Sequence, residues 1–369
     1  MEHTIFIRVS QIDSNSEPAR HCLWYKIHLA QKVVPFVIEE SEYDGPSKKP
    51  IAARYNRASS DCHSWSGSAA CNSKLYMIGG DLARLDVTSE SQDEVYVCSA
   101  TKATTDSSAW QKYPVKLTAK RHNPVAIAIQ NDIYIFGTVA RPSGSPIPWA
   151  EKIDTTSDTI NPLNAQPSKS SICAGFVLCS AVVNTNFQTK ILLATSHHCY
   201  NGPSRLLYYF VEDGRWEDVT KSHPNFFHGG PALSVRSAVI DGVLYTYHYK
   251  SVYAYDLENR EWFDHPVLGL LEEEQCYYQY DNNKGFVLDL GNGKLCVGFC
   301  TSFPLGEDQK AKLLLHYAMF TPYMDKKHPE ERSRRSIGTL VHSKGYCVLH
   351  GMHFTDAMIM KQAHGMQKI

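Results

Sequence analysis

The chain of 369 residues lacks the features that mark several large classes of protein. Its 37 Lys and Arg residues and 38 Asp and Glu residues leave a formal net charge of −1. A chain so balanced has no overall field to attract nucleic acid or an anionic membrane surface. No apolar run approaches the roughly 18 residues that a membrane-spanning helix needs. The sequence therefore predicts neither nucleic-acid binding nor a membrane span.

Signals of export are missing as well. Residues 1–10 alternate apolar and polar side chains and lack the continuous apolar stretch of a signal peptide. No Asn-x-Ser/Thr sequon occurs, and the 11 cysteines are an odd number. These absences favour a cytoplasmic protein, with the nucleus as an alternative, whose cysteines stay reduced.

What the chain does contain is a long series of short β-strand patterns, rich in Val, Ile, Leu, Tyr and Phe and bounded by Asn, Asp, Gly and Ser. Several segments share one plan: a small-residue strand, a polar turn, then a more hydrophobic strand. They span residues 66–80, 125–138, 177–195, 237–247 and 285–299, and a weaker copy spans residues 337–351. In the weaker copy, the predicted turn is His342-Ser343-Lys344.

The spacing of these segments predicts the fold. The second residue of each hydrophobic strand recurs every 50 to 60 residues or so, at Tyr76, Tyr134, Leu192, Tyr245, Cys296 and Tyr346. Further strands follow in some copies, at Val95–Val97, Leu206–Tyr209 and Val252–Asp256, and each of these precedes a tryptophan, Trp110, Trp216 or Trp262. A repeat of this length with four strands is typical of the blades of a β-propeller, and we expect the tryptophans to pack between strands.

The chain resembles the kelch repeat in three features. Gly79-Gly80 follows a second strand, Tyr253-Ala254-Tyr255-Asp256 forms a third strand, and Trp262 comes shortly after it. The resemblance, to plant kelch-type proteins of the galactose oxidase/kelch superfamily without their F-box, implies an all-β, six-bladed propeller of four-stranded antiparallel blades. It covers residues 1–369 as a single domain, and we expect a monomer.

A propeller needs a way to close its ring, because an open edge invites aggregation. The strands predicted at Thr4–Val9, Cys22–His28 and Val33–Ile38 would complete the last blade. We therefore expect residues 4–38 to pair with residues 336–361, and the strands of residues 337–351 to begin that blade.

Histidine and arginine side chains gather where first strands begin and second strands end, which is the same end of every blade. Such a convergence of polar groups is a candidate binding site. Forked arginine donors suit a carboxylate, a phosphate or an acidic side chain. The candidate ligand-binding residues are Arg121, Arg236, Arg335, His63, Trp65, His228, Arg84 and His350. The candidate acid–base residues are His122, His197, His198, His248 and His353, with Asp81 as an orienting carboxylate.

Two functions remain open from these residues. The first is a recognition module that binds a protein partner or a small metabolite through the His/Arg end. The second is a lyase, isomerase or cyclase of plant specialised metabolism that works without a cofactor through a histidine acid–base pair. The chain has no Cys-x-x-Cys, no His-Glu-x-x-His and no Gly-x-Ser-x-Gly, so we expect neither a metal or other cofactor nor serine hydrolysis.

Overall fold

The computed structural model describes the chain as β-strands with two short 3-10 helices. The described residues are 3–11, 21–29, 52–55, 66–80, 93–100, 110–121, 123–137, 148–164, 176–185, 187–196, 204–226, 236–248, 251–268, 270, 285–303, 312–324, 336–350 and 353–360. The chain divides into two compact units, Met1–Leu29 with Ala53–Ala165 and Thr355–Ile369, and Ala30–Ala52 with Gln166–Phe354. No helix within the described residues is long and apolar enough to cross a membrane.

The first unit contains two sheets of four consecutive strands, which we call blades. One blade runs through β4 (Gly67–Cys71), β5 (Lys74–Ile78), β6 (Val95–Ser99) and β7 (Gln111–Lys112). The next runs through β8 (Val125–Ile129), β9 (Asp132–Phe136), β10 (Ala150–Asp154) and β11 (Thr159–Pro162). All neighbouring strands pair antiparallel.

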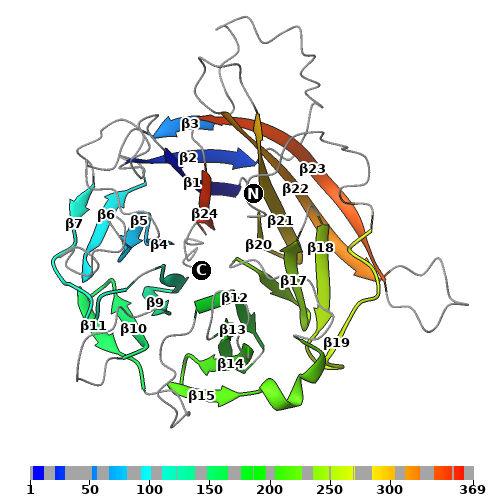
Figure 1. Cartoon of the computed structure of the whole chain (residues 1–369), viewed down its shortest axis with the longest axis horizontal. Helices are drawn as coiled ribbons and strands as arrows, with labels where there is room; N and C mark the ends of the chain where they lie inside the picture. The colour runs from blue at the N-terminus through cyan, green and yellow to red at the C-terminus, as the bar shows by residue number, and fades with distance from the viewer. Residues whose placement is uncertain are drawn as a thin grey trace, which may run out of the picture. The chain divides into compact units, whose positions relative to one another are not determined.

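A sheet assembled from both ends of the chain also belongs largely to this unit. Its order is β24 (His353–Ile359), β1 (His3–Gln11), β2 (His21–Leu29) and β3 (Ala52–Tyr55). The backbone N–H of Met360 donates to the carbonyl of Thr4 at 3.3 Å, which ties the end of β24 to β1. Figure 1 shows the red β24 beside the dark blue β1.

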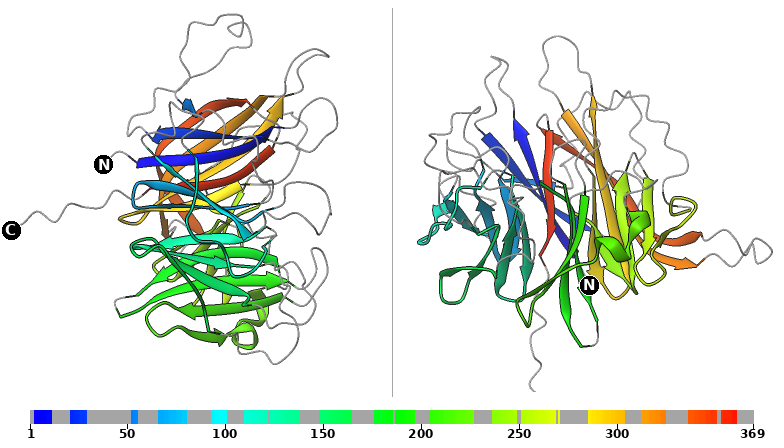
Figure 2. Two further views of the ribbon diagram at one scale, coloured as in Figure 1. Left: turned by 90° about the vertical axis from the view of Figure 1, so that its left-hand side faces the viewer. Right: turned by 60° about the horizontal axis from the view of Figure 1, so that its bottom comes forward.

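The second unit contains three blades, whose strands again follow in chain order. The first comprises β12 (Phe176–Asn184), β13 (Thr189–Ser196), β14 (Ser204–Phe210) and β15 (Arg215–Asp218), with the 3-10 helices η4 (Thr220–Ser222) and η5 (Pro224–Phe226) after it. The second comprises β16 (Ala238–Ile240), β17 (Val243–His248), β18 (Ser251–Asp256) and β19 (Glu261–Trp262). The third comprises β20 (Gly285–Gly291), β21 (Lys294–Phe303), β22 (Lys312–Met324) and β23 (Ile337–His350), and the long amber and orange strands of this blade run side by side in Figure 2.

The sequence prediction of six repeat-derived blades is wrong. Five of the predicted repeats supply the first two strands of five blades, but the sixth does not form a strand pair. Residues 337–350 are instead one strand, β23, at the edge of the fifth blade.

The predicted turn at His342 is a bulge rather than a turn. Val341 pairs with Phe320 and Ser343 with Met319, so His342 is the extra residue between them. Its Nε2 lies 2.7 Å from the Thr321 hydroxyl. A bulge absorbs one polar residue without reversing the strand, whereas the tight turns of other blades use positive φ, as at Asn72 and Asp241.

The predicted pairing of the two ends of the chain is also corrected in part. The strands predicted at Thr4–Val9 and Cys22–His28 are confirmed as β1 and β2, and they share a sheet with the C-terminal strand β24. The strand predicted to begin that sheet is β23, which lies in another one. The strand predicted at Val33–Ile38 lies outside the described residues.

The tryptophans pack between strands, as predicted. Trp110 stacks on Trp24 with ring centroids 5.4 Å apart, Trp216 meets Tyr209 at 4.9 Å, and Trp262 meets Tyr255 at 5.0 Å. Trp216 and Trp262 pack against the neighbouring strand of their own sheet, whereas Trp110 packs against Trp24 of β2, which belongs to the sheet formed by the two ends of the chain.

Candidate functional site

The described part of the chain contains the side chains of three predicted site residues, Arg121, Arg236 and His248. The backbones of His350 and His353 lie in β23 and β24. The other predicted site residues, His63, Trp65, Asp81, Arg84, His122, His197, His198, His228 and Arg335, lie outside the described residues.

Arg121, just before β8, is completely buried inside the first unit. Its Nε donates to Glu151 Oε1 at 2.6 Å. Its terminal nitrogens donate to the carbonyls of Gly137 at 2.9 Å, Trp149 at 2.8 Å and Pro148 at 2.8 Å. Four N–H bonds from one guanidinium account for most of the five donors that the group has. The structure therefore gives Arg121 a scaffolding role, and its guanidinium is not exposed to a ligand.

Glu151, at the second position of β10, is the acidic centre of this cluster. A carboxylate or a guanidinium is costly to bury unless it is paired with an opposite charge and hydrogen-bonded. The second oxygen of Glu151 accepts from the backbone N–H of Thr118 at 2.8 Å and from its hydroxyl at 2.7 Å. Glu151 is not predictable as a partner of Arg121 from the sequence, because a single acidic residue in a strand carries no signal of a partner that precedes it by 30 positions.

The double glycine of the kelch resemblance serves the same cluster. Gly79 and Gly80 have φ values of 60° and 101°, which side chains disfavour. The Gly80 N–H donates to the Arg121 carbonyl at 2.9 Å, and the Gly79 N–H donates to the Glu94 carbonyl at 2.9 Å. These glycines let the end of β5 turn toward the chain that leads into β8.

Arg236 and His248 lie at one end of the second blade of the second unit. Ala238 pairs with Tyr245, so the residues just before β16 and the last residue of β17 meet at the same end of the sheet. Arg236 and His248 are each partly exposed. Burial lowers the pKa of His248, which favours the neutral imidazole. The predicted convergence of these two side chains at one blade end is compatible with this register.

The backbone around Arg236 is held firmly. Arg236 forms a parallel bridge with Ser180 of β12, and the Ser237 N–H donates to the Ser180 carbonyl at 3.1 Å. The Val287 N–H of β20 donates to the Arg236 carbonyl at 2.9 Å. The first strands of the three blades of this unit are thus linked directly at Arg236, which fixes the start of its side chain.

An aromatic stack lies close to the same end. Tyr247 stacks on Phe299 with centroids 5.5 Å apart, and Phe299 stacks on His316 at 4.7 Å with nearly parallel rings. All three side chains are buried. Gly285 permits this packing, because a Cβ at that position would overlap the Tyr247 ring. Tyr247 directly precedes His248 in β17, so this buried packing holds the backbone of the blade end that carries Arg236 and His248.

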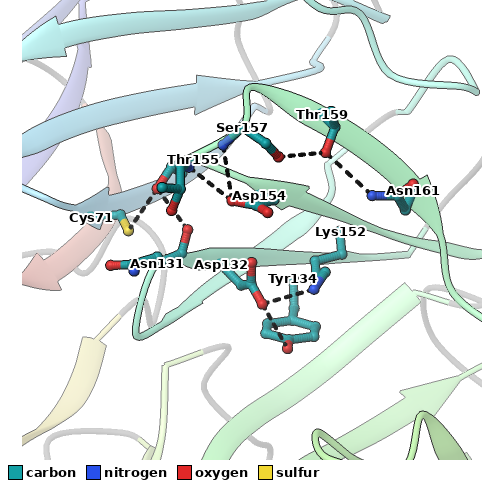
Figure 3. A network of polar contacts seen from close by, with 11 residues as sticks. Cys71, Asn131, Asp132, Tyr134, Lys152, Asp154, Thr155, Ser157, Thr159 and Asn161 are labelled. Carbon is teal, nitrogen blue, oxygen red and sulfur yellow. Dashed lines mark hydrogen bonds and ion pairs between the residues drawn. The ribbon is translucent and has the colours of Figure 1, made fainter.

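In the blades of the first unit, a polar network lies at the end with the turns between first and second strands, opposite to the end that carries Arg121, and its role is structural. The Thr155 hydroxyl donates to the Asn131 carbonyl at 2.6 Å and accepts from Asn72 at 2.8 Å (Figure 3). Asp154 caps the next turn by accepting from the N–H groups of Thr156 and Ser157. This is turn chemistry of the kind expected from the sequence.

Five cysteines, Cys71, Cys98, Cys179, Cys296 and Cys300, are free and buried. Burial raises the pKa of the Cys71 thiol, which donates to the Gln130 carbonyl at 3.3 Å. Burial also raises the pKa values of Cys179 and Cys296 to about 12. Such thiols remain protonated and poorly reactive. Among the described residues, no group of three or more His, Cys, Asp or Glu side chains could hold a metal ion.

Comparison with known proteins supports the fold alone. No protein-family model matches the chain, and no curated protein matches it. The structure of YjhT superposes with a TM-score of 0.53 at 11% identity, over 90% of this chain and 96% of that one. An extracellular domain of a putative one-component system, BT4673 from B. thetaiotaomicron, gives 0.36 at 11% identity, over 92% of this chain and 46% of that one. The Bombyx mori GH32 β-fructofuranosidase BmSUC1 gives 0.34 at 8% identity, over 97% and 92%. Together with its four-stranded antiparallel blades, the likeness to YjhT identifies this chain as an all-β protein of the β-propeller fold.

Proposed function

We propose that the chain is a kelch-type recognition module that binds a carboxylate or phosphate group at the blade end carrying Arg236 and His248. The group could belong to a small metabolite or to an acidic side chain of a protein partner. The proposal includes the cytoplasmic or nuclear setting expected from the sequence.

The observation that supports it most is the contrast between the two arginines that precede first strands. Arg121 is completely buried and bonded to Glu151, whereas Arg236 is partly exposed on a fixed backbone. An arginine whose backbone is held in place loses less conformational freedom when its guanidinium binds an anion. The planar fork matches a carboxylate or a phosphate oxygen pair.

His248 adds a neutral polar group at the same end. Because burial lowers its pKa, the ring is uncharged near neutral pH and can accept or donate one hydrogen bond. Arg236 would then supply the charge and His248 the directional contact. Histidine bonding of this kind suits a ligand that carries a hydroxyl beside its acidic group.

The test is a binding measurement with defined anions. Isothermal titration calorimetry would use citrate, inorganic phosphate and a short poly-glutamate peptide, so that free anions and acidic peptide are separate arms. Replacing Arg236 with Ala removes a charge-assisted bond of about 1.5–3 kcal/mol, so affinity should fall roughly 10- to 150-fold.

The matched control is Arg215→Ala. Arg215 begins β15 at the opposite end of a blade in the same unit, and its side chain is 53% exposed. The control removes the same charge and should leave binding unchanged. An equal loss of affinity in Arg236→Ala and Arg215→Ala would mean that only the overall charge attracts the anion, which would contradict the proposal. The proposal would also be wrong if the wild type bound none of the three ligands.

A further inference from the structure

The chain between β15 and β16 packs against the neighbouring blade before it reaches β16. Residues 219–226, which include η4 and η5, follow the first blade of the second unit and contact β18 and β19 of the second blade. We call these residues the bridging segment. Its start is tied to the first of the two blades, because the Val219 N–H donates to the Leu206 carbonyl at 2.9 Å and the Thr220 hydroxyl accepts from the Leu206 N–H at 2.9 Å. The segment therefore connects two blades of the same unit.

Two side chains of the bridging segment, His223 and Phe226, contact the second blade. The His223 Nδ1 and the Tyr255 hydroxyl are 3.1 Å apart. The Phe226 ring packs edge to face with Tyr255, with centroids 4.9 Å apart, and the Phe226 carbonyl accepts from the Trp262 indole N–H at 3.2 Å. His223, Phe226 and Tyr255 are all buried. His223 is thus a titratable group inside the contact between the two blades.

The bridging segment has little structure that could persist without this contact. η4 and η5 have three residues each. Their N–H groups of Ser222, His223 and Phe226 donate to carbonyls within the segment at 3.0, 3.2 and 3.1 Å. Helical turns this short are not stable in isolation. The protection of these amide hydrogens therefore depends on the docking of the segment, which can open locally while the strands stay paired.

The surroundings of His223 favour its neutral form. Burial lowers the pKa of His223, and the positive charge of Arg260 in the β18–β19 turn lowers it further. Burial raises the pKa of Tyr255, so its hydroxyl stays protonated and can donate to the neutral ring of His223. A proton on His223 would place a positive charge in a buried contact that already has a cation beside it.

The other ionisable side chains around the contact do not compensate for such a charge. They come from every element that packs there, and they are Lys221 of η4, Tyr208 of β14, Glu217 and Asp218 of β15, Asp256 of β18 and Glu261 of β19. Among the described residues, none of these carboxylates forms an ion pair with His223. Asp218 instead accepts from the Thr220 N–H at 3.0 Å, and Asp256 accepts from N–H groups of its own turn. A protonated His223 is therefore less costly where water can reach it, which requires the bridging segment to open.

We infer that the bridging segment forms a pH-sensitive contact between the two blades, which is closed while His223 is neutral and opens locally when His223 takes up a proton. The blades themselves stay joined at their first strands, where the Ser237 N–H donates to the Ser180 carbonyl at 3.1 Å. Opening would expose the buried Tyr255 ring under mildly acidic conditions. The inference concerns a different contact from the proposed anion site and does not depend on its ligand.

The direction of the pH effect follows from the two states of His223. In the open segment the imidazole has an ordinary pKa of about 6.5, whereas in the closed segment its pKa is lower. Such a group stabilises the closed state fully above about pH 6.5, and this contribution is lost as the pH falls below that value. Uptake of one proton can raise the equilibrium constant for opening by up to about tenfold between pH 7.5 and pH 5.5.

The experiment is hydrogen exchange of the full chain, measured by mass spectrometry at about pH 7.5 and pH 5.5 and corrected for the intrinsic pH dependence of exchange. Protection of residues 220–226 should fall by up to about tenfold at the lower pH, whereas residues 251–256 of β18 should keep theirs. His223→Gln keeps a side chain that can bond to Tyr255 but does not titrate, so its protection should not depend on pH. His265→Gln is the matched control, because His265 is exposed and follows β19 in the same unit, and it should respond as the wild type does.

A second variant keeps the inference testable if the segment of His223→Gln does not dock. Arg260→Asn removes the nearby cation, and asparagine tolerates the φ of 63° that Arg260 has. Its pH response should be smaller than that of the wild type, because one of the two causes that lower the pKa of His223 is gone. A wild-type segment with the same protection at both pH values, a full response in His223→Gln or in Arg260→Asn, or an equal loss of protection in β18 would each overturn the inference.

Discussion

Replacing Arg121 with Met should destabilise the first unit far more than any exposed charge removal. The substitution leaves the buried Glu151 without its cation and strips bond donors from the carbonyls of Gly137, Pro148 and Trp149. Removing one partner of a buried ion pair costs about 3–5 kcal/mol of unfolding free energy. Met is an apt replacement because it fills similar volume without a charge. Glu151 keeps its two bonds from Thr118, which places the expected loss at the lower end of this range.

The assay is equilibrium unfolding in urea, followed by tryptophan fluorescence. Trp149 is a suitable reporter, because its carbonyl accepts from Arg121 and its ring is buried against Phe136 at 5.9 Å. Arg215→Met serves as the control. Its side chain is 53% exposed, and its guanidinium lies 3.7 Å from the Glu217 carboxylate and 3.7 Å over the Phe210 ring. Exposed contacts of both kinds are weak, so the loss should stay at about 1 kcal/mol or less.

A double variant separates the charge effect from simple loss of packing. Arg121→Met with Glu151→Leu removes both buried charges, and should be more stable than Arg121→Met alone, since replacing a whole buried pair by apolar groups is often nearly neutral. A loss below about 1 kcal/mol in Arg121→Met would refute the scaffolding role. Additive losses in the double variant would show that packing, and not the unpaired carboxylate, causes the instability.

Three further changes should each be visible in the same unfolding assay. Gly285→Ala should cost about 1–3 kcal/mol by forcing a methyl group against the Tyr247 ring, and the loss should shrink in a Tyr247→Ala background. Gly80→Asn, at φ 101°, should cost about 1–3 kcal/mol, whereas Gly79→Asn, at φ 60°, should cost less because asparagine accepts that region. Burial and the nearby Arg260 lower the pKa of His223, so the folded chain resists its protonation and stability should fall as the pH drops below about 6.5. His223→Phe should flatten that decline, and an unchanged slope between pH 7 and pH 5 would refute the assignment.

The repeat pattern predicts first and second strands well because both are buried and hydrophobic. Leu75, Tyr76 and Ile78 of β5 are all buried, and so are Ile133, Tyr134 and Phe136 of β9. Such strands carry their own signal in the sequence, since every residue must suit a covered sheet. Outer strands such as Gln111–Lys112 are too short and too exposed to show a strand pattern in the sequence. Only the neighbouring tryptophans indicated where these outer strands lie.

The failure at residues 337–350 has a definite cause. His342-Ser343-Lys344 is polar and lies between two apolar runs, which is also how a hairpin turn looks. A hairpin turn and a bulge differ in backbone geometry, and the tight turns at Asn72 and Asn292 contain residues with positive φ. His342 lacks such a conformation, and its contact with Thr321 comes from a neighbouring strand that the local sequence does not reveal. Long-range pairing therefore decided between the two readings.

Arg121 and Arg236 show that the sequence next to a candidate site residue reveals little about the role of its side chain. Arg121 and Arg236 both precede a first strand, and nothing in the neighbouring sequence distinguishes the buried arginine from the partly exposed one. The carboxylate that receives Arg121 comes from the third strand of its blade, where Glu151 pairs with Ile135 of β9. In the repeat, Ile135 corresponds to Thr246 of β17, and the residue that pairs with Thr246 on the third strand is Tyr253. The two blades therefore place different residues at this position. A guanidinium can be buried completely only where a carboxylate and carbonyls receive it, so a residue on a remote strand decides whether an arginine before a first strand can become part of the scaffold.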